Sequence, residues 1–129
     1  MDYVWRPEIG RQQVAWMEKH LRHVKGPQAD RPITWQPWQR DYFSALYGWR
    51  VLGHDDIGRY RRALLEVARG NGKSTIASAI GVRGVTWGAA PLVIGAATDR
   101  EAAGIVFGDS ARMVRANPLL MEYLKVVDS

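Results

Sequence analysis

The stretch Val67-Ala68-Arg69-Gly70-Asn71-Gly72-Lys73-Ser74 decides the fold, because it places Gly-Lys-Ser between an apolar run and a helix-forming run. Residues 61–67 are predicted to form a short buried strand, and residues 74–80 are predicted to open a helix. A strand that leads through a loop into a helix aims backbone N–H groups and the positive end of the helix dipole at one point. The pattern therefore predicts a phosphate-binding loop.

Two side chains of this loop have predicted roles. Lys73 is expected to reach the β- and γ-phosphates of a nucleotide, and the Ser74 hydroxyl is expected to ligate Mg²⁺. The general pattern G-x-x-x-x-G-K-[ST] has glycine where this chain has Val67, so the loop is a variant. Its conformational freedom must then come from Gly70 and Gly72. The alternative interpretation is a chance Gly-Lys-Ser in a glycine-containing turn.

The length and composition are those expected of a single globular domain. The 129 residues are 47% hydrophobic, which is enough apolar mass for a core. The sequence has no run of 18 apolar residues and no apolar signal segment at its start, so neither a membrane nor secretion is expected. Zero cysteines exclude disulfides and fit a reducing compartment. The net charge of +5 suits a polyanionic partner, although an ordinary solvated surface explains it equally well.

The first part of the chain has helical patterns. Residues 11–25 have the spacing of an amphipathic helix that stops at Gly26-Pro27. A second helix is predicted from Pro37 to about Gly48. Residues 53–58 are rich in turn formers and are predicted to be a loop.

The second part alternates strand and helix patterns. After a small-residue connection at 84–90, residues 91–97 are predicted to be a second buried strand. Thr98 is the expected N-cap of the next helix, with Glu101 completing a capping box, and Asn117-Pro118 is the expected stop. Strands that alternate with helices predict an α/β fold with a right-handed βαβ unit and a parallel sheet flanked by helices. A last helical turn is predicted from Pro118 to Lys125.

Three motifs together resemble the start of a tailed-bacteriophage terminase large subunit, the DNA-packaging motor: Trp38-Gln39, the loop from Ala68 to Ser74, and the run from Gly95 to Ala103. The resemblance extends from about residue 30 to residue 127. Terminases are similar to one another in replacing the early loop glycine and in having arginine where Arg69 stands. The departure at Val67 is therefore expected within that family.

The resemblance implies a P-loop NTPase of the additional-strand ATPase type, incomplete in this chain. Residues 1–52 would be a helical preamble with the adenine-binding motif, and residues 53–129 would be the first part of the ATPase core. ATP and Mg²⁺ are the implied cofactors, and ATP hydrolysis would drive packaging of double-stranded DNA into a capsid. The implied partners are that DNA, a portal protein, a small terminase subunit and further copies of the chain in a ring. The implied location is the host cell cytoplasm, docked on the procapsid.

The resemblance also assigns site residues. Gln39 resembles the family's adenine-contacting glutamine, and its alternative is an ordinary exposed helix residue. Arg69 would act on the γ-phosphate as an arginine finger supplied in cis, and its alternative is a surface charge that pairs with Glu66. Arg69 and Lys73 are the expected catalytic residues, and Ser74 is the expected metal ligand. The expected nucleotide-binding residues are Gln39, Arg69, Gly70, Asn71, Gly72, Lys73, Ser74 and Thr75.

One part of the family's machinery has no counterpart in this sequence. No apolar strand that ends in adjacent carboxylates follows residue 97, so the Walker B acid and the nuclease residues are missing. The chain looks like an N-terminal fragment or a short split gene, and alone it is not expected to hydrolyse ATP. Two alternatives remain open: another P-loop ATPase of a helicase-like kind, and a truncated non-catalytic module that binds a nucleotide or phosphate or assembles with a partner.

Overall fold

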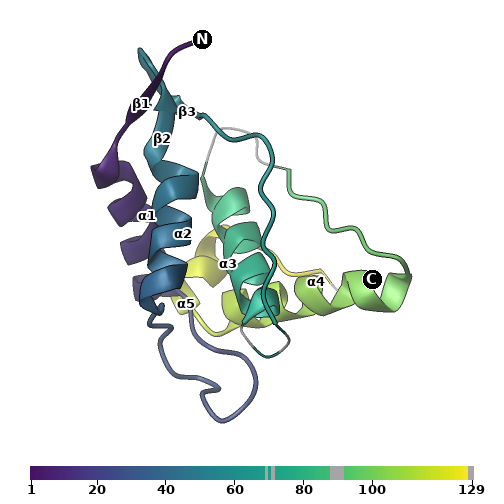
Figure 1. Ribbon diagram of the computed structural model, residues 1–129. Coiled ribbons are helices and arrows are strands. Elements are labelled where there is room, and N and C mark those ends of the chain that lie inside the picture. The colour runs from purple at the N-terminus through teal and green to yellow at the C-terminus, as the bar shows by residue number, and fades with distance from the viewer. Residues whose placement is uncertain (69, 71, 88–91, 128–129) are drawn as a thin grey trace. The chain divides into compact units, whose positions relative to one another are not determined.

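The computed structural model describes residues 1–68, 70, 72–87 and 92–127 (Figure 1). The chain divides into two compact units. Unit 1 consists of Met1–Lys19 and Thr34–Glu66. Unit 2 consists of His20–Ile33 and Val67–Ser129. Among the described residues, no helix is both long and apolar enough to cross a membrane.

Two helices form the core of unit 1, α1 (Pro7–His20) and α2 (Pro37–Gly48). Each begins with a proline, whose fixed φ and missing N–H suit the first turn of a helix. The two helices approach closely at Gly10, where an added Cβ would lie 2.9 Å from the Ser44 carbonyl oxygen. Met17 and Phe43 are fully buried in this core.

The predicted second helix is confirmed by α2, but the prediction of a helix over 11–25 was wrong at both ends. Helix α1 starts four residues earlier, at Pro7, and ends at His20. The chain leaves the helix there because residues 21–33 pair with one another. Arg22 and Pro32 form an antiparallel bridge, and the His23 N–H donates to the Arg31 carbonyl oxygen at 2.9 Å.

Unit 1 also contains a three-stranded antiparallel sheet in the order β1 (Tyr3–Trp5), β2 (Trp49–Val51) and β3 (His54–Gly58). Trp5 lies opposite Trp49 in the first pair of strands. The predicted loop at 53–58 was wrong, because residues 54–58 form β3 and only Gly53, at φ 83°, provides the turn. A strand partner distant in sequence outweighs a turn-forming composition.

Unit 2 contains three helices: α3 (Lys73–Thr86), α4 (Arg100–Arg115) and α5 (Pro118–Tyr123). Helices α3 and α4 pack together through buried apolar residues, which include Ile76, Ala79, Val82, Ala111 and Val114. A pair of serine side chains joins the same helices. Ser78 Oγ donates to the Val106 carbonyl oxygen at 3.3 Å, and Ser110 Oγ donates to the Ser78 carbonyl oxygen at 3.4 Å.

The connection 20–33 is attached to the end of α4 by polar contacts. Asn117 Nδ2 donates to the His20 carbonyl oxygen at 2.8 Å. Asp109, only 2% exposed, lies 3.0 Å from Lys25 Nζ through one oxygen and 3.0 Å from Arg112 through the other. Removing either cation should lower the stability of the fold, since it leaves the buried carboxylate charge less compensated.

The two buried strands predicted for the phosphate-loop sheet are not confirmed. Residues 61–67 and 92–97 belong to no strand in the part of the chain that the structure describes, and residue 91 lies outside it. Their side chains are exposed: Leu64 is 83%, Leu92 81% and Ile94 78% exposed. A strand needs ladder partners, and no described segment supplies them. The structure is therefore an α/β arrangement whose only described sheet is the small antiparallel one of unit 1.

The remaining helix predictions are mostly confirmed. Helix α3 opens beside Ser74, α4 ends at Arg115 near the expected stop, and α5 is the expected last turn. Two details were wrong. The connection expected at 84–90 begins later, because α3 continues to Thr86 and residues 88–90 lie outside the described part. The N-cap of α4 is Asp99 rather than Thr98, since Asp99 Oδ1 accepts a hydrogen bond from the Ala102 N–H at 2.7 Å.

Candidate functional site

The start of α3 has an unusual backbone. Its N-cap is Gly72, at φ 82° and ψ 21°, and Gly70 has φ 87°. Both values lie in the left-handed region, which glycine enters without the steric cost that a Cβ brings. These are the two glycines to which the sequence analysis assigned the freedom of the loop. The helix proper begins at Lys73, and the Ile76 N–H donates to the Gly72 carbonyl oxygen at 2.9 Å.

No side chain in the described part of the chain caps the first turn of α3, and that turn holds no acidic residue. The other helices of unit 2 differ. Asp99 caps α4, and Asn117 Oδ1 caps α5 by accepting from the Leu119 N–H at 2.9 Å. The first N–H groups of a helix have no partner within the helix, so they must find a side chain, water or a ligand. At α3 no described side chain accepts from these donors, which lie at the positive end of the helix dipole, an arrangement that suits a phosphate.

The polar side chains after Gly72 are accessible in different degrees. Lys73 is exposed, whereas Ser74 and Thr75 are half-buried. Arg69 and Asn71, both expected in the site, lie outside the described residues. Within the described part of the chain, no group of three or more His, Cys, Asp or Glu side chains is arranged to hold a metal ion.

Gln39 has a structural partner in unit 1. It is 9% exposed, and its Oε1 accepts a hydrogen bond from the Gln36 N–H at 2.8 Å, which closes the start of α2 as a capping box. Gln36 Oε1 in turn accepts from Trp38 Nε1 at 3.0 Å. The alternative of an ordinary exposed residue is therefore wrong for Gln39. Within the described part of the chain its Nε2 has no recorded acceptor, and an amide can donate as well as accept, so contact with a purine edge is chemically open to it.

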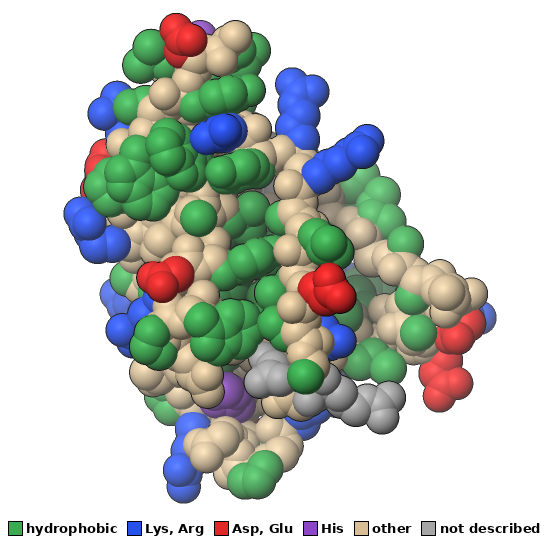
Figure 2. Space-filling view, viewed as in Figure 1, with side chains coloured by type: hydrophobic (Ala, Val, Ile, Leu, Met, Phe, Trp, Pro, Cys, Tyr) green, Lys and Arg blue, Asp and Glu red, His purple; other side chains and the backbone are tan. Residues whose placement is uncertain are grey.

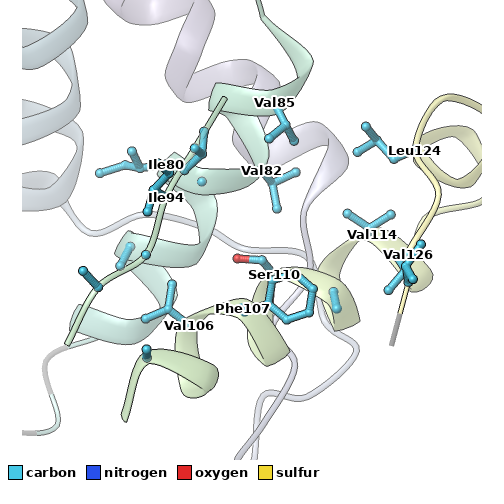
Figure 3. Close-up of a pocket in the computed structure, with 18 of the residues that line it drawn as sticks. Ile80, Val82, Val85, Ile94, Val106, Phe107, Ser110, Val114, Leu124 and Val126 are labelled. Atoms are coloured by element: carbon cyan, nitrogen blue, oxygen red, sulfur yellow. The ribbon is translucent and has the colours of Figure 1, made fainter. Parts of the chain in front are cut away.

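An apolar cavity of about 810 Å³ lies in unit 2 between α3 and α4 (Figure 3). Extended residues 93–97 line one part of it, and residues 124–127 line another. Figure 3 shows Val82 from α3, Phe107 from α4 and Val126 from the last segment around this space. The lining residues are predominantly apolar, so the cavity is a surface suited to packing.

A model of the family described as "Terminase large subunit, ATPase domain" matches residues 37–128. The chain belongs to this family. It is 28% identical over 123 residues to the large terminase subunit of Enterobacteria phage HK97, a match that covers 93% of this chain and 23% of that protein. It is also similar to the crystal structure of the HK97 bacteriophage large terminase, with a TM-score of 0.68 and 26% identity over 98% of this chain and 24% of that one. This terminase chain thus spans about a quarter of the length of those relatives.

An ATPase domain uses a nucleotide, so the uncapped start of α3 is the candidate nucleotide site of this terminase chain. The sequence analysis missed two polar residues of unit 2, Asp99 as the helix cap and Asp109 as a buried carboxylate. The burial of Asp109 could have been predicted, because it lies at helical spacing between Val106 and Met113 on the buried side of α4. Its partner Lys25 is distant in sequence and could not have been found that way.

Proposed function

We propose that this chain is the ATP-binding part of a phage terminase large subunit, in which ATP hydrolysis powers the packaging of double-stranded DNA into a capsid. The observation that carries the proposal is the start of α3, where two positive-φ glycines precede a helix with no side-chain cap, followed by Lys73 and Ser74. The family match over residues 37–128 supports the same function.

The roles of the loop residues follow from charge and geometry. Backbone N–H groups at Gly72 and in the first turn of α3 hold phosphate oxygens, and Lys73 adds a point charge beside the β- and γ-phosphates. The Ser74 hydroxyl, with Thr75 beside it, is placed to take part in holding Mg²⁺, which when bound neutralises phosphate charge. Arg69 acts on charge that develops at the γ-phosphate, and Asn71 contributes to the loop. Gln39 reads the adenine through its Nε2 donors.

The finer fold is also a proposal. We infer that residues 61–67 and 91–97 are strands of a parallel phosphate-loop sheet in a longer protein, with 1–52 as the preamble and 53–129 as the first part of the core. The exposure of Leu64, Leu92 and Ile94 supports this inference, because such side chains are normally covered in a parallel sheet. The apolar cavity beside residues 93–97 and 124–127 offers the surface against which that sheet would pack.

The partners follow from the same function. They are double-stranded DNA, a portal protein, a small terminase subunit and further copies of the large subunit in a ring, in the host cytoplasm at a procapsid. The family match and the similarity to the HK97 large terminase support this set. The net charge of +5 is compatible with a DNA partner.

Isothermal titration of the chain with Mg-ATP tests the proposal. We expect weak binding and turnover well below the roughly 1 s⁻¹ at the slow end of ordinary enzymes, since the sequence holds no carboxylate in a catalytic position. Lys73→Ala should abolish the binding, and Lys19→Ala, which removes an exposed lysine of α1, should not change it. Equal binding by the Lys73→Ala and unaltered chains would contradict the assignment of the site.

A further inference from the structure

The small sheet of unit 1 has aromatic side chains that remain open to solvent. Tyr3 and Trp5 lie two residues apart on β1, so their side chains share one face of the sheet. Tyr3 is 43%, Trp5 41% and Tyr60 43% exposed. Trp5 packs beside Trp49 of β2, with ring centroids 5.4 Å apart. We call the surface formed by Tyr3, Trp5, Trp49, Arg59 and Tyr60 the aromatic face.

An arginine lies at the centre of the aromatic face. The Arg59 guanidinium carbon is 4.8 Å from the ring centroid of Tyr3 and 5.2 Å from the centroids of both Trp49 and Tyr60. The Arg59 N–H also donates to the Trp49 carbonyl oxygen at 3.0 Å, which fixes the backbone beside β2. A planar cation held by three rings is pre-organised, yet Arg59 remains an exposed residue.

Trp5 packs closely against its neighbours in unit 1. Gly48 faces its ring so closely that an added Cβ would lie 2.5 Å from Trp5 Cζ3. One side of the ring is therefore covered by Gly48 and Trp49, while 41% of the residue stays exposed. A ring with one supported side and one open side is a stacking surface whose orientation is already set.

Exposed charges of both signs lie next to the aromatic face in sequence, and Asp2 directly precedes Tyr3. Arg61 and Arg62 follow Tyr60 directly and are exposed. Of the two acidic residues on β3, Asp55 has a cationic partner, because Arg6 Nε lies 3.2 Å from Asp55 Oδ1. Asp56 remains an exposed carboxylate of β3. Figure 2 shows hydrophobic side chains gathered where the strands lie, with Lys or Arg side chains among and beside them.

The chemistry of this face selects a ligand that offers flat apolar surfaces joined by anions. Nucleobases stack on aromatic rings and on guanidinium planes, and the phosphates between them pair with arginine. A duplex covers the faces of its bases by stacking, so only unpaired bases can use these rings. We propose that the aromatic face binds single-stranded nucleic acid, with bases on Tyr3, Trp5 and Tyr60 and phosphates at Arg59, Arg61 and Arg62. This inference does not depend on the nucleotide site.

The binding of a fluorescein-labelled 20-mer of deoxythymidine, followed by anisotropy, tests this inference. The double substitution Tyr3→Ala with Tyr60→Ala should weaken binding about tenfold or more, since one stacked base contributes about 1–3 kcal/mol. Trp87→Ala is the matched control, because Trp87 is 39% exposed and lies 5.2 Å from the Arg83 guanidinium in unit 2. It should leave the affinity unchanged.

Salt dependence separates the arginines from the rings. The affinity falls as the salt concentration rises, with a slope of log affinity against log salt of about −0.7 for each single-strand phosphate contact. Arg61→Ala with Arg62→Ala should make this slope less steep by about 1.4. The tyrosine substitutions should lower affinity without changing that slope. Titration of each variant with Mg-ATP should match that of the unaltered chain, so failure here is distinguishable from failure of the nucleotide site.

Three results would overturn the inference. The first is a loss of affinity in Trp87→Ala equal to that of the tyrosine variant. The second is tighter binding of a 20-base-pair duplex than of the single strand. The third is a dimer, seen by analytical ultracentrifugation, that the tyrosine substitutions dissociate, which would assign the face to a second copy. Circular dichroism shows whether the tyrosine variant folds. If it does not, a 5-iodouracil oligonucleotide is photocrosslinked to the unaltered chain instead. Crosslinks at no residue of the aromatic face would then reject the inference.

Discussion

Helices α3 and α4 lie packed together in unit 2, yet they begin in opposite ways. Helix α4 starts at Asp99, in extended backbone, with a carboxylate that accepts a hydrogen bond from its first turn. Helix α3 starts at Gly72, in left-handed backbone, with no capping side chain in the described part of the chain. A capped start contributes to stability and has little capacity left for a ligand. An uncapped start gives up that stability and keeps its N–H donors for one.

Helix α2 of unit 1 represents an intermediate case. Its start is closed by Gln36 and Gln39, but through an amide that can still donate hydrogen bonds. Helix starts within one chain thus differ in which groups satisfy their first N–H donors, and the difference depends on one or two residues. Substitutions at these starts should therefore differ in how far they change stability and how far they change affinity.

The largest effect is expected just before α3, in a longer terminase chain that hydrolyses ATP. Arg69→Ala should leave nucleotide affinity nearly intact and lower turnover about a hundredfold or more, because an arginine finger acts on charge that develops in the transition state. Lys73→Ala should lose affinity and turnover together. Steady-state kinetics with a parallel titration of each variant provide the measurement. Equal losses of affinity in the two variants would assign Arg69 to ground-state binding, and no loss in Arg69→Ala would make it a surface charge.

A smaller effect is expected at Gly72 itself. Gly72→Ala forces a Cβ into backbone at φ 82° and should weaken Mg-ATP binding about tenfold while costing about 1–2 kcal/mol of stability. Gly53→Ala is the matched control, since Gly53 has φ 83° in the turn between β2 and β3 and no atom within 4 Å of an added Cβ. Gly53→Ala should lower the free energy of unfolding in urea by a similar amount and should not lower the affinity for Mg-ATP. A loss of affinity in both variants would mean that the effect is one of folding.

The capped start of α4 should respond in the opposite sense. Asp99→Ala removes the acceptor for the Ala102 N–H and should cost about 1 kcal/mol of unfolding free energy, with no change in Mg-ATP affinity. Thr98→Ala should be close to neutral, because Thr98 is not the cap. Urea denaturation followed by circular dichroism compares the two. A larger loss of unfolding free energy in Thr98→Ala than in Asp99→Ala would instead support Thr98 as the cap, as the sequence predicted.

The smallest effect is expected at the start of α2. Gln39→Glu keeps an oxygen that can accept from the Gln36 N–H and removes the amide donors, so stability should not fall. Affinity for Mg-ATP should fall about threefold, the effect of losing one hydrogen bond of under 1 kcal/mol. Inorganic triphosphate, which has no base, should bind both forms equally. If the variant binds Mg-ATP as tightly as the unaltered chain does, Gln39 is only a cap.

Predictions from the sequence were most reliable where a structure depends on adjacent residues. Gly70 and Gly72 supplied the positive-φ positions of the loop, Pro37 marked the start of α2, and Pro118 marked the start of α5. Each of these signals acts through local backbone sterics, which a reading of the sequence captures directly. The motif around Lys73 also identified the family, which the match over residues 37–128 confirmed.

Predictions failed where a distant partner decides the structure. Residues 54–58 have the composition of a loop but form β3 because β2 pairs with them. The strand predicted at 91–97 is not confirmed, since residues 92–97 belong to no sheet in the described part of the chain. Likewise, the pairing of residues 21–33 ends α1 at His20, and contacts between separate strands create the aromatic face around Arg59. The sequence alone determined the positive-φ glycines and the start of α3, because backbone sterics are local properties. Only the tertiary structure decided which extended segments became strands, because ladder hydrogen bonds and buried faces require neighbours that local sequence does not specify.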